Sequence, residues 1–447
     1  MTRRSASSQP IVGSGKAADG SLDVPGGGDC GRGAASSRAG SRPVMSSLSS
    51  DMARPRIAII AGEHSGDLLG GKLMAAINAR CNGPVHYFGV GGPEMTARGL
   101  VSQFPIEDIE VMGLGAILRR LPTIVRRVYQ SVDSAIAALP DVVIIIDAPE
   151  FTHAVARRIR QRAPHIPIID YVSPSVWAWR SGRARKMSRY IDHILALLPF
   201  EPKVHARLGG PRCDYIGHPL ADRTSWIKAL DVAPLSKRLG LDKQQPVLVV
   251  LPGSRSSEIA KLMAPFGKTL ELLARQGPAP QVIMPVLEAR RSLIEEALKA
   301  WPLRPHLVSG DKDKFRAFRL ADAALAASGT VTLELAIAGT PMVVGYRIGP
   351  LTALIVRPLI EAKSAVLANL VLDENAFPEF MQQECQPQNL AAAIADLLSD
   401  TPARRRQLKA LARIPEALAV AGETPSLAAA DIVLRYVEKG RPAMLCG

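Results

Sequence analysis

The sequence has few aromatic residues and few features of a metal-binding or disulfide-linked protein. Phe, Trp and Tyr make up 4% of the 447 residues, which disfavours proteins that bind oligonucleotides or glycans on stacked rings. The five cysteines are scattered and form no CxxC pair, so neither a disulfide framework nor a Cys-ligated zinc site is expected. The eight histidines form no HExxH motif, and we therefore expect no metal and no cofactor. No run of 18 uncharged apolar residues occurs, so no transmembrane helix is expected.

Acidic residues are outnumbered by basic ones. The 55 Lys and Arg against 41 Asp and Glu give a net charge of +14. This excess favours anionic partners, which include nucleic acid, anionic lipid and phosphorylated metabolites, without choosing among them.

The first 53 residues are rich in Gly, Ser, Ala and Arg and hold almost no bulky apolar side chains. Such a segment buries too little surface to offset its ordering entropy, so we expect a disordered N-terminal extension. A translation start at Met45 or Met52 is an equally good interpretation. We expect the folded protein to begin near Arg56.

From that point short apolar runs alternate with longer amphipathic ones. Runs of four to eight residues that are apolar at every position are typical of strands buried on both faces, and the alternation predicts parallel α/β sheets. A polar stretch after Gly217–Leu220 separates two series of such runs. We therefore predict two Rossmann-like domains, 54–220 and 221–400, facing each other across a cleft, and a helical tail over 401–447. The predicted strands are Ile57–Ala61, Val142–Asp147, Ile166–Val172, Ile191–Leu198, Val247–Leu251, Val282–Val286, Ala323–Ala327 and Pro341–Tyr346.

Two polar loops follow strands of the first series, and ligands bind at the carboxyl ends of such strands. Residues 62–67 read GEHSGD, which suits either a ligand loop or a turn with a helix cap. Residues 147–150 read DAPE. A carboxylate in this position, from Asp147 or Glu150, is a candidate general base; the alternative is that Asp147 only fixes the loop.

Two loops of the second series combine small residues with a following helix. In residues 251–258, LPGSRSSE, the loop amides and Arg255 predict an anion site of diphosphate size, unless Arg255 is a surface residue beside a helix cap. Residues 328–334, SGTVTLE, repeat this plan. Glu334 is placed to accept hydrogen bonds from a ribose diol, or else is a solvent-facing helix charge.

Two further segments combine apolar or aromatic residues with arginines. Residues 171–180, YVSPSVWAWR, suit a sugar phosphate, although the tryptophans are equally typical of a core. Residues 111–128, VMGLGAILRRLPTIVRRV, predict a basic amphipathic helix that either lies on an anionic membrane or packs against the core. Its predicted membrane contacts are Leu114, Leu118, Leu121, Arg119 and Arg120.

Together these motifs resemble the lipid-A-disaccharide synthase family, which comprises inverting glycosyltransferases of the GT-B type. In family order the chain carries GEHSGD (62–67), VMG (111–113), IDAPEF (146–151), YVSPSVWAWR (171–180), LPFE (198–201), GHP (217–219), LPGSR (251–255), ASGTVTLE (327–334) and PMVVGY (341–346). The resemblance covers about 54–400. The chain departs from it at Ser364–Asn369, where the family usually has an aromatic residue and a proline before the asparagine.

The resemblance implies transfer of 2,3-diacylglucosamine from UDP-2,3-diacylglucosamine to 2,3-diacylglucosamine 1-phosphate, with no metal, giving a β-1,6 disaccharide and UDP. It also implies a homodimer on the cytoplasmic face of the bacterial inner membrane. Our hypothesis makes Asp147 the base and Arg255 the clamp on the leaving diphosphate. The predicted donor site comprises Ser254, Arg255, Ser328, Gly329, Thr330 and Glu334, and the predicted acceptor site or loop comprises Glu63, Ser65, Gly66, Asp67, Trp179 and Arg180.

Two other functions fit the residues less well. A nucleotide-sugar epimerase or hydrolase would use the same fold without an amphiphilic acceptor. A nucleic-acid-binding protein would explain the charge, yet no motif of that class accompanies the basic clusters, and we expect no nucleic-acid partner.

Overall fold

The computed structural model describes residues 54–81, 83–110, 114–349 and 362–440. The segment 1–53, for which we predict disorder, lies outside the described residues. So do the side chains of residues 114–119, although their helix is described.

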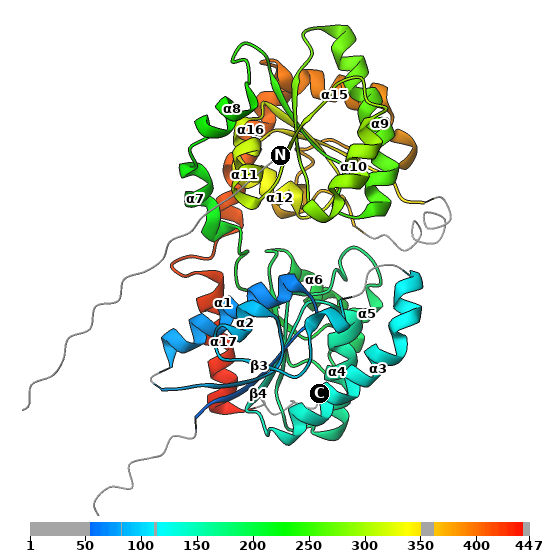
Figure 1. Ribbon diagram of the computed structural model, residues 1–447. Helices are drawn as coiled ribbons and strands as arrows, with labels where there is room; N and C mark the ends of the chain where they lie inside the picture. Colours follow the sequence, from blue (N-terminus) through cyan, green and yellow to red (C-terminus); the bar gives the residue numbers. More distant parts are fainter. Residues whose placement is uncertain (1–53, 82, 111–113, 350–361, 441–447) are drawn as a thin grey trace, which may run out of the picture. The chain divides into compact units, whose positions relative to one another are not determined.

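The first sheet, whose strands β3 and β4 are labelled in Figure 1, has seven parallel strands in the order β3-β2-β1-β4-β5-β6-β7. The strands are β1 (Arg56–Ala61), β2 (His86–Val90), β3 (Val101–Ser102), β4 (Val142–Ile146), β5 (Ile168–Tyr171), β6 (His193–Ala196) and β7 (Arg212–Tyr215). The helices are α1 (His64–Arg80), α2 (Pro93–Thr96), η1 (Ile106–Asp108), α3 (Leu114–Ala137), α4 (Pro149–Arg162), α5 (Gly182–Met187) and α6 (Glu201–Leu208).

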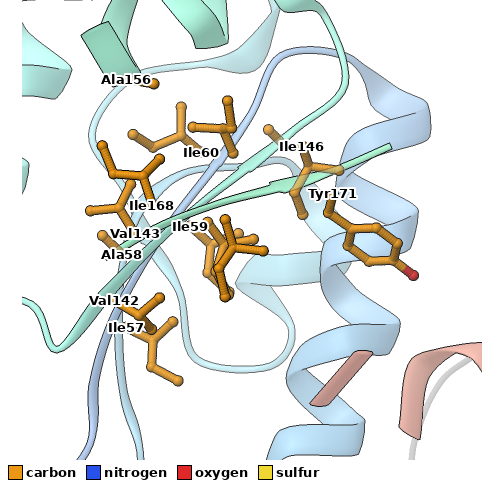
Figure 2. Close-up of a cluster of buried hydrophobic side chains, with 14 of the residues drawn as sticks. Ile57, Ala58, Ile59, Ile60, Val142, Val143, Ile146, Ala156, Ile168 and Tyr171 are labelled. Atoms are coloured by element: carbon orange, nitrogen blue, oxygen red, sulfur yellow. The ribbon is translucent and has the colours of Figure 1, made fainter. Parts of the chain in front are cut away.

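The central strands of this sheet are buried on both faces, as their uninterrupted apolar composition predicts. All five residues of β4 and the last five of β1 are buried. Figure 2 shows Ile57–Ile60 of β1 packed with Val142, Val143 and Ile168 of the neighbouring strands. Because the strands are parallel, their carboxyl ends lie at one edge, and the loops after β1, β4 and β5 meet there.

The second sheet has six parallel strands in the order β10-β9-β8-β11-β12-β13. The strands are β8 (Val247–Leu251), β9 (Gln281–Pro285), β10 (His306–Val308), β11 (Ala323–Ala326), β12 (Met342–Tyr346) and β13 (Glu379–Met381). The helical segments are η2 (Ala221–Arg223), α7 (Thr224–Ala229), α8 (Ala233–Leu239), α9 (Ser256–Gln276), η3 (Glu288–Arg290), α10 (Arg291–Leu298), α11 (Asp311–Leu320), α12 (Val331–Ala338), α14 (Leu367–Leu372), η5 (Gln382–Glu384), α15 (Pro387–Leu398) and α16 (Pro402–Ala417).

Two apolar clusters cover the two faces of the second sheet. One includes residues of α7, α8, α11, α12 and α16, and the other includes residues of α9, α10 and α15. The final helix, α17 (Pro425–Lys439), instead packs against α1, and Val433 and Tyr436 belong to the core of the first sheet. The last two helices of the chain thus join different cores.

The predicted α/β class with two parallel sheets is confirmed, and each predicted apolar run forms a strand. The strands that the pattern did not reveal are β2, β3, β7, β10 and β13. Most of them are short, lie at or near a sheet edge and carry polar residues, as in Arg212–Tyr215, so their composition does not differ from that of a loop.

Candidate active site

The loops after β1 and β4 meet at a carboxylate. The Ser65 hydroxyl donates a 3.0 Å hydrogen bond to Oδ2 of Asp147, so the segments 62–67 and 147–150 lie together as the sheet order requires. The amide of Asp147 donates to the Tyr171 carbonyl, which links this turn to the end of β5.

The turn at Asp147 has an unusual backbone that its neighbours hold in place. Asp147 and Ala148 adopt φ angles of 55° and 41°, in the left-handed region that non-glycine residues rarely occupy. The Ala148 amide donates to Asp147 Oδ1 at 2.8 Å, and the Thr152 hydroxyl donates to the Asp147 carbonyl at 2.7 Å. Gly62 makes the turn possible, because a Cβ there would lie 2.2 Å from the Ala148 side chain. The half-buried Asp147 carboxylate is therefore held in one orientation.

A second carboxyl group, that of Glu63, lies in the electric field of Asp147. Burial is the main cause of its raised pKa, and the negative charges of Asp147 and Glu110 raise it further. Arg255, from the loop after β8, lowers the pKa of the same group. Glu63 therefore interacts electrostatically with both residues to which we assign catalytic roles. Glu150 differs: its side chain is 79% exposed and pairs with Arg183.

Asp67 needs a correction, because its side chain faces the protein rather than a ligand. The carboxylate is 1% exposed and accepts hydrogen bonds from the amides of Gly92, Glu94 and Met95, where α2 begins. Gly66 is also buried, and a Cβ there would lie 3.2 Å from the Ile146 carbonyl. Asp67 and Gly66 therefore have structural contacts within the protein, and Glu63–Ser65 remain as the candidate residues of this segment.

The two tryptophans after β5 have different environments. Trp177 packs partly buried against Phe200 and donates from Nε1 to Glu201 Oε1 at 3.2 Å. Trp179 is 37% exposed, and the Arg180 guanidinium stacks over its ring at 4.3 Å. Val172 and Arg180 have φ angles of 85° and 54°, so backbone strain recurs here. Trp177 is thus packed within the protein, whereas Trp179 is accessible, and its contact with a sugar phosphate stays a prediction.

Glu201 is a buried acid at the site that sequence reasoning missed. Its side chain accepts hydrogen bonds from Trp177 and from the Leu198 amide, and burial raises its pKa to about 8. The native state therefore holds a proton that the unfolded chain releases near its ordinary pKa of 4.5. It follows that the stability contribution of this group falls as pH rises between these two values.

A Glu201→Gln variant, which mimics the protonated acid, tests this assignment. We expect the melting temperature of the variant, relative to that of the unsubstituted protein, to rise by several degrees between about pH 5 and about pH 9, because only the ionised carboxylate is costly to bury. Thermal unfolding across this range measures the difference. A difference that does not change with pH would contradict the raised pKa.

The loop after β8 forms an anion site, but the protein itself supplies the anion. Oε2 of the buried Glu258 accepts hydrogen bonds from the amides of Ser254 and Arg255. Its Oε1 pairs with Arg255 at 3.1 Å and accepts from the Tyr346 hydroxyl at 3.2 Å. Glu258 thus occupies the amides of Ser254 and Arg255 in this structure, and the predicted binding of a diphosphate by this loop stays a prediction. The Arg255 side chain, 65% exposed, remains accessible.

The loop after β11 keeps the predicted order of strand, small residues and helix. The Ser328 hydroxyl donates to the Ala365 carbonyl at 2.6 Å, and Gly329 has a φ of 140°. Thr330 is exposed just before α12 begins. Glu334, one turn into α12, is 20% exposed and pairs with Lys314 at 2.8 Å, so it is not a free surface charge.

One large pocket, of about 2430 Å³, brings these segments together. Its lining includes all six predicted donor residues and Trp179, together with residues that we did not predict: Glu201, His218, Arg290, Asp311, Lys314 and Tyr346. Four other predicted residues, Glu63, Ser65, Asp147 and Arg180, are not among the described residues that line the pocket. Asp147 is linked to the pocket residue Arg255 through the electrostatic interaction of both with Glu63. Over the described residues, no three His, Cys, Asp or Glu side chains gather as they would around a metal ion.

The apolar side chains of the amphipathic helix α3 lie in two environments, the protein core and the exposed surface. Ile124 and Val128 pack against the core, whereas Leu121, Val125 and Tyr129 are between 45% and 49% exposed. Packing against the core is therefore confirmed for the buried part of the helix, and membrane contact stays a prediction for the exposed part. The side chains of Leu114, Leu118 and Arg119 lie outside the described residues.

The arginines of α3 also differ from one another. Arg120 is exposed and donates to the Glu107 carbonyl, while Arg127 pairs with Asp108 and stacks over Phe104. Arg127 thus faces the protein rather than a membrane. Within the described part of the chain, no helix has the length and apolar character needed to cross a bilayer.

Known proteins share both the sequence and the fold. The family described as lipid-A-disaccharide synthetase matches residues 57–429. The chain belongs to this family. The lipid-A-disaccharide synthase of Rhodopseudomonas palustris strain BisB18 is 52% identical over 389 residues, which cover 87% of this chain and 97% of the relative. The enzyme of that name from Nitrobacter hamburgensis is 50% identical over 86% of this chain and 96% of its own length.

A solved structure of UDP-GlcNAc 2-epimerase from Neisseria meningitidis bound to UDP-GlcNAc has a TM-score of 0.59 to this chain. It is 12% identical and covers 86% of this chain and 100% of its own, so this likeness shows the fold alone. The chain is a glycosyltransferase of the lipid-A-disaccharide synthase family with the two-sheet GT-B fold.

Proposed function

We propose that this enzyme transfers 2,3-diacylglucosamine from UDP-2,3-diacylglucosamine to 2,3-diacylglucosamine 1-phosphate. The products are the β-1,6-linked disaccharide 1-phosphate and UDP. The observation that carries the mechanism is the position of Glu63, which interacts electrostatically both with the fixed carboxylate of Asp147 and with the accessible guanidinium of Arg255. We assign Asp147 as the proton acceptor and Arg255 as the positive group for the departing diphosphate.

In this mechanism the 54–220 domain binds the acceptor and the 221–400 domain binds the donor. Asp147, oriented by Ser65 and the Ala148 amide, takes the proton from the attacking 6-hydroxyl of the acceptor. The anomeric carbon is attacked from the face opposite the leaving group, so its configuration inverts. Trp179, with Arg180 stacked on it, provides an aromatic wall and a positive charge that suit the acceptor sugar phosphate.

The donor is held by fixed charges and dipoles of the second domain. Arg255 stabilises the negative charge that develops on the leaving UDP, and the loop 328–330 at the start of α12 adds backbone dipoles. Glu334 accepts hydrogen bonds from the ribose. We infer that Glu258 releases the amides of Ser254 and Arg255 when the diphosphate arrives, because both anions seek the same donors.

A turnover assay with the two purified substrates and a chelator tests this function. Formation of the disaccharide and UDP with chelator present is the expected result. Release of UDP from the donor alone, at the same rate with or without acceptor, would instead indicate a hydrolase. Interconversion of the donor sugar would indicate an epimerase.

We further propose that α3 holds the enzyme, as a homodimer, on the cytoplasmic face of the inner membrane, where its lipid substrates lie. The exposed apolar stripe Leu121, Val125 and Tyr129 and the neighbouring exposed Arg126 support this. Arg158, stacked 5.1 Å from the Tyr129 ring, adds positive charge from α4.

Replacing Leu121 and Val125 together with Ser is expected to weaken binding to vesicles that contain anionic lipid by about tenfold or more, because each lost apolar side chain removes 1–2 kcal/mol of burial. Sedimentation with vesicles measures this, and thermal unfolding checks the fold. Leu139 and Val101, which are exposed elsewhere on the same domain, provide a matched double-Ser control. Equal binding by all three proteins would contradict α3 as the anchor.

A further inference from the structure

Three charged side chains of α11 and α12 lie in a row on the wall of the pocket. The Lys314 ammonium is 2.8 Å from Oε1 of Glu334 and 3.3 Å from Oδ1 of Asp311. All three residues line the pocket, and the side chains of Lys314 and Glu334 are only 26% and 20% exposed. The lysine therefore lies between two carboxylates that reach the same cavity.

A fourth charge anchors the other end of this row. Arg223, in the connection between the two sheets, forms an ion pair with Asp311. Its guanidinium also lies 4.6 Å from the centre of the Trp226 ring and 4.7 Å from that of Phe315. Packing against two rings restricts the arginine, and the arginine in turn restricts Asp311. The signs alternate from Arg223 through Asp311 and Lys314 to Glu334.

This row has two physical consequences for Glu334. A glutamate side chain loses rotamer freedom when it binds a ligand, and a partner that already holds it lowers this cost. Because Lys314 engages Oε1, the acceptor capacity of Oε2 is left for a hydroxyl group.

We propose that Lys314, held by Asp311, is a positioning residue that orients Glu334 toward the ribose of a nucleoside diphosphate sugar. This inference rests on the proposed function, in which Glu334 binds that ribose. It adds that recognition of the 2′-hydroxyl depends on an ion pair with the preceding helix and not on Glu334 alone.

The test compares UDP with 2′-deoxy-UDP as ligands of the full-length enzyme by isothermal titration calorimetry. We expect the unsubstituted enzyme to prefer UDP. Lys314→Met should weaken UDP binding by about tenfold, because a charge-assisted hydrogen bond to the 2′-hydroxyl is lost. The variant should bind 2′-deoxy-UDP nearly as well as the unsubstituted enzyme does, because that ligand lacks the hydroxyl. The donor KM should rise by about the same factor while kcat changes less than about twofold. Lys314→Arg, which keeps the charge, should restore the preference for UDP.

The control is Lys312→Met, which removes the same charge from an exposed position of α11 and should leave both affinities unchanged. If Lys314→Met retains the preference for UDP, or weakens both ligands equally, the positioning role is wrong. Glu334→Gln separates this outcome from a failure of the proposed function. If Glu334→Gln loses the preference while Lys314→Met keeps it, only the inference about Lys314 fails; if Glu334→Gln keeps it, the ribose role of Glu334 fails as well.

Discussion

An Asp147→Asn enzyme is expected to lose about 10²–10⁴-fold in kcat while binding UDP as tightly as before, because a general base contributes about that factor. Asparagine fits the same space and still accepts the hydrogen bond from the Ala148 amide, so the strained turn should remain intact. Single-turnover rates with both substrates measure the loss, and titration with UDP checks the donor site.

Glu150→Gln is the matched control for this variant. Glu150 lies three residues further along the same loop, carries the same charge and is largely exposed beside Arg183. It should keep nearly full activity. Near-normal turnover of the Asp147→Asn enzyme would exclude Asp147 as the base and would make the neighbouring Glu63 the first residue to examine.

Loss of the Arg255 guanidinium is the second large effect that we expect. Arg255→Ala should reduce kcat by about 10²–10³-fold, as removal of a preorganised group that stabilises developing charge typically does. UDP affinity should also fall. Arg275→Gln is the control and should retain activity. Arg275 lies near the C-terminal end of α9, the helix that Arg255 precedes, and pairs there with Glu271.

Arg255→Ala has a second consequence that must be separated from the first. Removing the guanidinium leaves Glu258 without its charged partner, and an unbalanced carboxylate in the loop repels a diphosphate. The double variant Arg255→Ala with Glu258→Gln resolves this. If the double variant recovers full activity, repulsion by Glu258 caused the loss, and Arg255 is not the clamp on the leaving group.

The sequence was sufficient to predict the fold where burial is complete. Strands such as Val142–Ile146 are apolar at every position because both faces are covered, and their shortness and β-branched residues distinguish them from a buried helix. The edge strand Glu379–Met381 is half-buried and could not be distinguished from a loop. The predicted helical tail contains the helix Pro402–Ala417, but the sequence did not give its bounds, because it carries five arginines and lysines and its apolar face is formed by the scattered Ala410, Leu411 and Ile414.

The candidate site was predictable to the level of the loop but not of the side chain. Motif order placed Asp67 and Ser65 in one loop, yet only the fold shows that Asp67 caps α2 while Ser65 contacts Asp147. In the same way, the sequence could not show that Lys314 reaches Glu334 from another helix. Such pairs depend on tertiary distances that no local pattern encodes.

The return of α17 to the first sheet makes that domain discontinuous in the chain. Its core is completed by Val433 and Tyr436, and Arg80 of α1 pairs with Glu423 and Asp431, more than 200 residues beyond β7. A nascent chain on the ribosome must therefore hold a nearly finished sheet with one face of α1 uncovered while the whole second domain is synthesised. The second domain, by contrast, is contiguous and has all its strands by Met381. Premature termination before α17 would thus spare the second domain and leave the first domain exposed to aggregation and proteolysis.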